Sequence, residues 1–141
     1  PQALAEIAAL LEISTTEVAS VVGFYTLYYD EPRGRYRIQV CTDLPCAMRG
    51  ADQFLAGLCA YLGVEVGGTT PDGLFTVEAV KCLAACHRAP MFQVQGEGGA
   101  GQGYGIDYHE NQTLETAIAW IEDVRARAGS ALAANKEAPI P

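Results

Sequence analysis

The segment VKCLAACHRAPMFQV, residues 80–94, places Cys82 and Cys86 four positions apart, after one strand-like stretch and before another. A structural disulfide, a redox dithiol, a zinc site and an iron–sulfur cluster all use cysteine pairs of this kind. The segment by itself does not distinguish these uses. The choice depends on the other cysteines of the chain, which are Cys41, Cys46 and Cys59.

The number of cysteines argues against a disulfide framework. The chain has five, an odd count, and its start lacks the basic region followed by an apolar region that marks a secretory signal. It also lacks an apolar run long enough to cross a membrane. Because the sequence opens with Pro1 inside a helical pattern, we expect a further N-terminal piece to precede it. These features predict a cytoplasmic protein whose thiols bind metal or act in redox chemistry.

The charge of the chain argues against a nucleic-acid partner. Lys and Arg number 9 and Asp and Glu 17, which gives a net charge of −8. The segment LAEIAALLEISTTEVASVV, residues 4–22, has the pattern of a helix-turn-helix, but the first 32 residues contain no Lys or Arg. Binding to nucleic acid needs cations at the phosphates. We therefore expect no contact with DNA or RNA.

Hydrophobic periodicity predicts an α/β chain in three parts. A helical N-terminal segment over residues 1–32 contains two short helices, and Ser14 and Glu17 form a capping box at the second. A domain over residues 33–129 follows, and then a flexible tail over 130–141. The elements expected in the domain are strands at 35–40, 74–80, 91–94 and 104–108, a crossover helix from about Pro45 to Leu62, and a last helix at 113–128.

The order of these elements predicts that four cysteines meet. Cys41 follows the first strand and Cys82 follows the second. Two strands joined by a crossover helix run parallel, and their carboxyl ends lie at the same edge of the sheet. The loops that carry Cys46 and Cys86 are therefore brought together as well. Cys59 falls on the apolar face of the crossover helix, so we expect it in the core.

The spacing of the four cysteines excludes one kind of site and leaves two others open. The pairs are C-x4-C and C-x3-C, so the C-x-x-C of a thioredoxin-type dithiol is absent. Structural zinc sites commonly include a tight C-x2-C pair, although looser spacings occur. A [2Fe–2S] cluster is bound by four thiolates, and wider spacings such as C-x4-C are common among its ligands. A [2Fe–2S] centre and a zinc-stabilised interaction module both remain open at this point.

Two other motifs allow a functional interpretation. The Gly-rich segment QGEGGAGQG, residues 95–103, is not followed by Gly-Lys-Ser/Thr or by a helix, which favours a hairpin tip over a phosphate site. The segment GFYTLYY, residues 23–29, clusters aromatic residues that fit either core packing or a surface that binds a partner.

Two longer segments carry a family resemblance. FYTLYYDEPRGRYRIQVCTDLPCAMRGA, residues 24–51, and TPDGLFTVEAVKCLAACHRAPMFQV, residues 70–94, resemble the 24-kDa-type [2Fe–2S] subunits of NADH:quinone oxidoreductase, respiratory complex I. The resemblance implies a thioredoxin-like domain with a small mixed sheet flanked by helices. It also implies one [2Fe–2S] cluster, with Cys41 and Cys46 on one iron and Cys82 and Cys86 on the other.

The resemblance carries further expectations about function. The chain would be an electron-transfer subunit of an NADH dehydrogenase (quinone), with no NADH oxidation of its own and no catalytic residue. Its partner would be the flavin-bearing, NADH-binding subunit, and it would lie at the cytoplasmic side of the membrane through its complex. Related subunits of NAD-linked formate dehydrogenases and hydrogenases share the motif. His87 is expected beside the ligands and not among them, and Pro90 stands where thioredoxin-like proteins commonly keep a cis proline.

Overall fold

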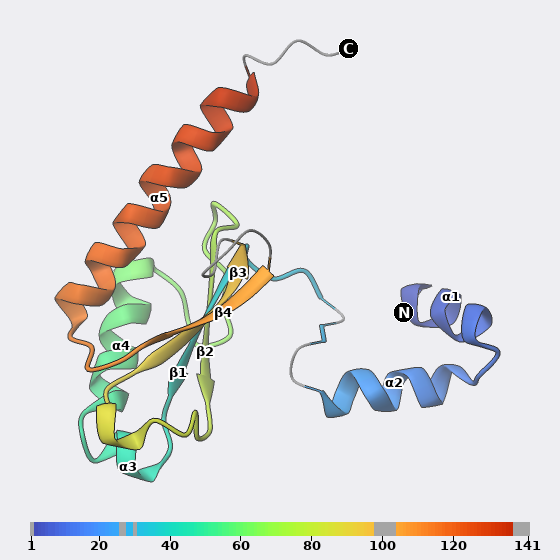
Figure 1. Cartoon of the computed structure of the whole chain (residues 1–141), viewed down its shortest axis with the longest axis horizontal. Coiled ribbons are helices and arrows are strands. Elements are labelled where there is room, and N and C mark those ends of the chain that lie inside the picture. Colours follow the sequence, from blue (N-terminus) through green and yellow to red (C-terminus); the bar gives the residue numbers. More distant parts are fainter. Residues whose placement is uncertain (1, 26–27, 30, 98–103, 137–141) are drawn as a thin grey trace. The chain divides into compact units, whose positions relative to one another are not determined.

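The computed structural model describes residues 2–25, 28–29, 31–97 and 104–136 (Figure 1). Contacts between residues divide the chain into two compact units, residues 1–33 and residues 34–141. Each unit is described below by itself.

The first unit consists of two short helices. α1 spans Gln2–Leu11 and α2 spans Thr15–Phe24. The predicted capping box is present at α2: the Glu17 backbone N–H donates to Ser14 Oγ at 3.2 Å, and the Ser14 N–H donates to the Glu17 carboxylate at 2.9 Å. Within the described part of the chain, only this pair of helices, bent by 114°, has the length and composition of a membrane span, and no single helix has them.

The second unit is built on a four-stranded mixed sheet with the order β2-β1-β3-β4. Its strands are β1 Tyr36–Cys41, β2 Phe75–Val80, β3 Phe92–Glu97 and β4 Tyr104–His109. β1 and β2 are parallel, with Cys41 opposite Val80, while β3 runs antiparallel to both of its neighbours. The predicted α/β class, the four strands and the parallel crossover are confirmed.

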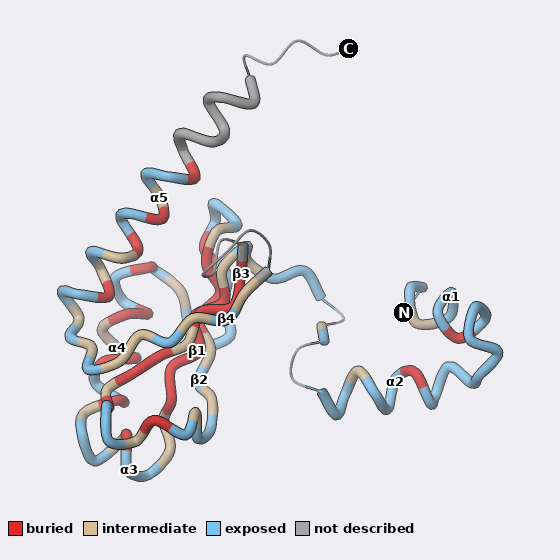
Figure 2. Tube along the Cα trace, in the orientation of Figure 1, coloured by how far each residue is buried: buried red, intermediate tan, exposed pale blue. Residues whose placement is uncertain are grey.

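Two helices pack side by side on one face of the sheet (Figure 2). They are α4, Ala51–Leu62, and α5, Leu114–Lys136. Alternate residues of β1, Ile38 and Val40, point to this face and are fully buried with Leu58 and Ile121. This core holds the sheet, and therefore the ends of β1 and β2, in a fixed position.

Two predicted helix boundaries were wrong. The crossover was expected as one helix from about Pro45, but it consists of α3, Leu44–Ala47, and α4, with a break at Gly50. Gly50 has a φ of +91°, a left-handed conformation that suits glycine and interrupts a helix. The last helix was expected to stop before Gly129, yet α5 continues to Lys136, because one glycine costs a helix only about 1 kcal/mol. The predicted Gly-rich hairpin tip lies largely outside the described residues, which omit 98–103.

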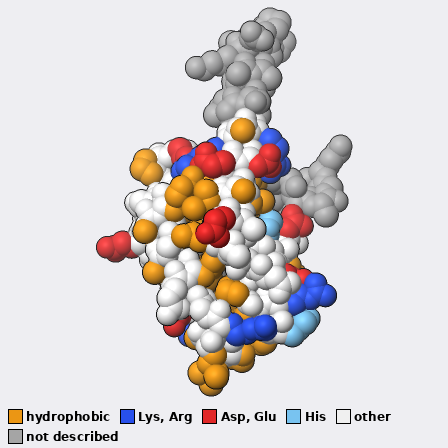
Figure 3. Space-filling model, turned by 90° about the vertical axis from the view of Figure 1, so that its left-hand side faces the viewer, with side chains coloured by type: hydrophobic (Ala, Val, Ile, Leu, Met, Phe, Trp, Pro, Cys, Tyr) orange, Lys and Arg blue, Asp and Glu red, His pale blue; other side chains and the backbone are white. Residues whose placement is uncertain are grey.

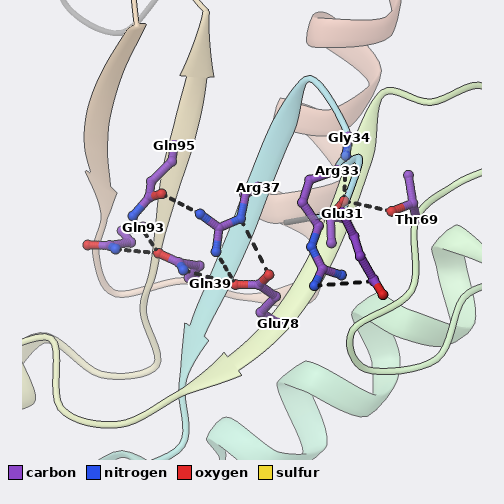
Figure 4. Close-up of polar contacts among 10 residues, drawn as sticks. Glu31, Arg33, Gly34, Arg37, Gln39, Thr69, Glu78, Gln93 and Gln95 are labelled. Atoms are coloured by element: carbon purple, nitrogen blue, oxygen red, sulfur yellow. Dashed lines mark hydrogen bonds and ion pairs between the residues drawn. The ribbon is translucent and has the colours of Figure 1, made fainter. Parts of the chain in front are cut away.

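The opposite face of the sheet carries a network of polar side chains (Figure 4). Arg37 is 4% exposed, and its guanidinium donates to Gln95 Oε1 at 2.6 Å and to Glu78 Oε2 at 2.5 Å. Gln39 donates to the same Glu78 carboxylate at 2.9 Å, and Gln93 donates to Gln39. Among the described residues, no buried side-chain nitrogen or oxygen lacks a hydrogen-bond partner. The network therefore holds neighbouring strands in register.

Candidate metal centre

The first cysteine pair is built into the sheet. Cys41 is the last residue of β1, and its backbone N–H donates to the Met91 carbonyl at 3.3 Å. Cys46 lies in α3, and its N–H donates to the Asp43 carbonyl at 2.9 Å. Both residues are only 1% exposed. The backbone of β1 therefore holds Cys41 in position, and the backbone of α3 holds Cys46.

The second pair lies in a more open loop. Cys82 comes two residues after the end of β2 and is exposed, and Cys86 is half-buried at the start of a short 3-10 helix, η1, Cys86–Arg88. Between them, Ala84 has a φ of +60°. The left-handed conformation is unfavourable for alanine by about 1–2 kcal/mol, so this loop is held in shape by its surroundings.

The two loops meet, as the parallel crossover predicts. Cys41 and Cys46 pack in one buried cluster with small and apolar residues between β2 and β3, namely Ala85, Ala89 and Met91. Cys41 lies close enough to Cys46, and Cys82 to Cys86, to raise the pKa of its neighbour. All five cysteines are free thiols. The predicted ligands therefore form two pairs at one edge of the sheet.

The surroundings favour the protonated thiols when no metal is bound. Burial, the hydrogen bond to Cys41 and the other nearby thiols raise the pKa of Cys46 to about 12. Burial and the hydrogen bond to Cys82 also raise the pKa of Cys86. Thiolates, not thiols, bind metal, so loading the site has to release protons.

The arrangement of two pairs fits a binuclear centre. Four thiolates are the usual ligands of a [2Fe–2S] cluster, with two on each iron. A structural zinc ion instead gathers four ligands around one point. The donor set and its division into pairs fit the binuclear cluster.

Cys59 and His87 lie where the sequence places them. Cys59 belongs to the core cluster between the sheet and α4, 9% exposed, and burial raises its pKa. His87 is exposed, and its Nε2 accepts a hydrogen bond from Arg88 Nε at 3.1 Å. The Ala89–Pro90 peptide bond is cis, as the resemblance implies.

The surface around the two loops includes residues that the sequence analysis missed. Leu44 and Met48 are 71% and 81% exposed, at the end of the domain that carries α3, where Figure 3 shows hydrophobic side chains next to basic ones and histidine. Arg49 lies at the same end, and its Nη1 donates to the carbonyls of Cys86 and His87 at 3.1 and 2.8 Å. In the sequence, only the position of Arg49 three residues after Cys46 indicates that it lies near the cysteines.

Comparison with known proteins decides the family. The model of the thioredoxin-like [2Fe–2S] ferredoxin family matches residues 1–125. The chain belongs to this family. Its cofactor is accordingly the [2Fe–2S] cluster, which confirms the resemblance and removes zinc as the expected metal.

Several relatives of this ferredoxin are named as subunits of NADH-quinone oxidoreductase. One such subunit, from Thermus thermophilus, is 44% identical over 97 residues, which are 69% of this chain and 54% of the relative. Another, from Rhizobium meliloti, is 38% identical over 123 residues, which are 87% of this chain and 67% of the relative. The ferredoxin thus spans between about half and two thirds of the length of these relatives.

A solved structure shares the fold. An NAD⁺-reducing [NiFe]-hydrogenase in the air-oxidized state superimposes with a TM-score of 0.71 over 89% of this chain and 20% of the hydrogenase chain. The two sequences are 23% identical in this region. The likeness supports the thioredoxin-like fold of the ferredoxin.

Proposed function

We propose that this ferredoxin is an electron-transfer subunit of an NADH-oxidising complex, most closely of the NADH:quinone oxidoreductase kind. One [2Fe–2S] cluster would be held by Cys41 and Cys46 on one iron and by Cys82 and Cys86 on the other. The observation that carries the proposal is the packing of Cys41 and Cys46 against the loop of Cys82 and Cys86, at the edge formed by the ends of β1 and β2. The relatives named as subunits of NADH-quinone oxidoreductase support the choice of complex.

The four proposed ligands differ in their exposure to solvent. Cys41 and Cys46 are fixed by the sheet and shielded from water, while Cys82 is exposed. The cluster supplies one-electron chemistry when bound, and the protein sets its position and surroundings. Electrons would pass on the side of Cys82, which is the most exposed of the four cysteines.

A flavin-bearing, NADH-binding subunit is the partner that this chemistry requires. NADH delivers a hydride, which carries two electrons, whereas a [2Fe–2S] centre accepts one at a time. A flavin can divide the pair. The ferredoxin alone is then expected to show no NADH oxidation, and its complex would sit at the cytoplasmic side of the membrane.

The helical segment over residues 1–32 is the docking element in this proposal, and residues 33–129 carry the cluster. Large apolar side chains of the segment lie in water, with Phe24 78%, Tyr25 55% and Tyr28 57% exposed. An apolar groove of about 270 Å³ lies within the same unit, lined among others by Ile7 and Val21. Exposed aromatic residues beside an apolar groove are typical of protein interfaces.

Subunits of NAD-linked hydrogenases or formate dehydrogenases are the second candidate. The likeness to the NAD⁺-reducing hydrogenase favours this candidate at the level of the fold. In either complex the cluster, its cysteines and the one-electron role would be the same.

The test uses the chain prepared without oxygen, first by iron and sulfide analysis and a visible spectrum. Two irons and two sulfides per chain, with the colour of a [2Fe–2S] centre, are expected. Zinc, or four irons, would refute the cofactor assignment. NADH is then added, and bleaching of the visible band is followed for the chain alone and after addition of the flavoprotein subunit.

Bleaching is expected only with the flavoprotein present. Rapid bleaching of the lone chain would refute the proposal that NADH is oxidised on a separate subunit. The docking element is tested with the double variant Tyr25→Ala and Tyr28→Ala, which should bind the flavoprotein more weakly. Tyr108→Ala on β4 is the matched control, since that tyrosine is 53% exposed in the other unit. Equal binding by the double variant and the control would move the interface away from the aromatic segment.

A further inference from the structure

We propose that Arg49 is a positioning residue that fixes the separation between the two cysteine pairs. The inference rests on the proposed binding of the cluster by Cys41, Cys46, Cys82 and Cys86. It concerns contacts that Arg49 makes with the backbone of one ligand from each pair. Arg49 itself is not a ligand.

Arg49 is hydrogen-bonded to both loops at once. Its backbone N–H donates to the carbonyl of Cys46 at 3.0 Å. Its side-chain Nη1 donates to the carbonyl of Cys86 at 3.1 Å and to that of His87 at 2.8 Å. A single residue thus connects the main chain at a cysteine of the first pair to the main chain at a cysteine of the second.

The second loop needs such a connection more than the first. Two of its backbone hydrogen bonds are local: Arg88 N–H donates to the Ala85 carbonyl at 2.9 Å, and Ala89 N–H donates to the Cys86 carbonyl at 3.4 Å. A third joins η1 to the segment after β4, since Asn111 N–H donates to the Arg88 carbonyl at 2.7 Å. These bonds shape η1 but do not tie it to α3. Ala84 is moreover held in a left-handed conformation in the exposed part of the loop. Without Arg49, the spacing would depend on the small apolar contacts of Ala85 and Ala89 with the first pair and on the hydrogen bond from Cys41 N–H to the Met91 carbonyl, beyond the loop.

The guanidinium suits this role for a geometric reason. It is planar, with its donors at fixed angles, and a charged donor makes hydrogen bonds about twice as strong as a neutral one. Its charge should matter less than its geometry, because Arg49 is exposed and solvent screens an exposed charge. The main effect of Arg49 should therefore be on how firmly the cluster is held, with a smaller effect on the reduction potential.

The experiment compares Arg49→Met, Arg49→Lys and the wild-type chain, each loaded with the cluster. Methionine removes the charge and all donors, while lysine keeps the charge but can donate to the two carbonyls only in a looser geometry. Arg127→Met is the matched control, since Arg127 is an exposed arginine of α5 whose side chain is paired with Asp123 at 2.9 Å. The measurements are the rate of iron release to a chelator, the reduction potential, and hydrogen exchange of residues 82–89 in the cluster-free chain.

We expect Arg49→Met to release iron at least about tenfold faster than the wild type and to exchange faster at residues 82–89 without the cluster. Arg49→Lys should lie between the two, with the potential of the wild type, and Arg127→Met should match the wild type throughout. The difference should persist in about 1 M salt, where surface charge effects are screened.

Release and exchange rates equal to those of the wild type in Arg49→Met would overturn the proposal. So would a difference that disappears in high salt or that lysine abolishes completely, since either result would assign the effect to charge. If Arg49→Met fails to fold by circular dichroism, Arg49→Lys and Arg49→Gln provide the same comparison. A wild-type chain that takes up no [2Fe–2S] cluster would instead refute the proposed function, which separates the two failures.

Discussion

The two cysteine pairs have the same residue type and similar spacing, but different structural support. Cys41 and Cys46 are 1% exposed and lie on a strand end and a helix that the core holds in place. Cys82 and Cys86 lie on a loop that is exposed at one of them and strained at Ala84. The difference indicates that the first pair anchors the site, whereas the second closes over it and exposes it to a partner.

The difference also has an energetic side. Around the first pair, small apolar residues exclude water, which stabilises the fold by their burial and raises the pKa of Cys46. Around the second pair, fewer buried contacts support the chain, and local opening costs less free energy there. Changes to the first pair should therefore affect the fold and the cluster together, and changes to the second should affect mainly the cluster.

The largest effect is expected from removing a ligand. Cys→Ala at position 41, 46, 82 or 86 should each abolish the cluster, because one iron is left with a single thiolate. In the cluster-free chain the four variants should differ. Cys46→Ala should lower the free energy of unfolding by about 1 kcal/mol through lost packing, and Cys82→Ala by less than about 0.5 kcal/mol.

Iron analysis measures the first effect, and urea unfolding of the cluster-free chains measures the second. A variant at any of the four positions that keeps two irons would show that the ligand set is wrong. Equal stability losses for Cys46→Ala and Cys82→Ala would remove the proposed difference between the anchored and the exposed pair.

The meeting of the two pairs could be predicted from the sequence because it depends on strong signals. The alternation of residues 36–40 and of 75–79 indicates two strands, the periodicity between them indicates a crossover helix, and parallel strands end at the same edge. The family then followed from the segments around the cysteines and was confirmed.

The unequal support of the two pairs could not be predicted. It depends on contacts between residues far apart in sequence, such as that of Arg49 with Cys86, which leave no periodic pattern. The break at Gly50 was missed for a related reason, since a glycine within a helical pattern is compatible with a continuous helix and with a left-handed turn.

The next prediction concerns the cysteine that is not a proposed ligand. Cys59→Ser should retain the cluster and its spectrum, because Cys59 lies in the core between the sheet and α4. The hydroxyl would replace an apolar thiol in a buried position, which should cost about 1–3 kcal/mol of unfolding free energy. Visible spectra and urea unfolding measure the two quantities. Loss of the cluster in a chain that stays folded would place Cys59 among the ligands.

A pair of backbone changes compares the two loops directly. Gly50 and Ala84 both adopt left-handed conformations, the first next to the anchored pair and the second between the exposed pair. Gly50→Ala should destabilise the chain by about 1 kcal/mol through its conformation, since an added Cβ would meet nothing closer than Gln53 Oε1 at 3.8 Å. Ala84→Gly should relieve strain and gain about 0.5 kcal/mol, because glycine loses part of the gain through its larger entropy in the unfolded chain.

Unfolding free energies of the cluster-free chains measure both changes, and iron release from the loaded chains shows where they act. Gly50→Ala should lower the unfolding free energy of the whole domain, whereas Ala84→Gly should raise it by about half as much and should also change the rate of iron release. A higher unfolding free energy for Gly50→Ala would contradict the assignment of the two loops. So would a higher unfolding free energy for Ala84→Gly without any change in the rate of iron release.

The smallest effect is expected from pH and acts on both pairs together. The ring of His109 is half-buried. It stacks on the ring of Phe92, with 4.6 Å between the ring centroids, and it makes an edge contact with the ring of Trp120, with 5.0 Å between the centroids. Burial lowers the pKa of His109 below 6.5, against the opposing influence of Asp107. The unfolded chain then binds more protons than the folded chain below pH 6.5, so this contribution to stability is complete above pH 6.5 and decreases as the pH falls towards the folded pKa. Urea unfolding of the cluster-free chain between about pH 7.5 and 5 should show this loss of stability. His109→Phe, which keeps the stacking, should make the loss smaller.

Hydrogen exchange tests whether the effect of pH reaches both cysteine pairs. Because the ring of His109 packs against Phe92 and Trp120 of the shared core, hydrogen exchange at residues 41–46 and at 82–86 should increase by a similar factor on acidification. An increase confined to residues 82–86 would show that acid opens the second loop locally, and an unchanged pH dependence in His109→Phe would assign the effect to another group.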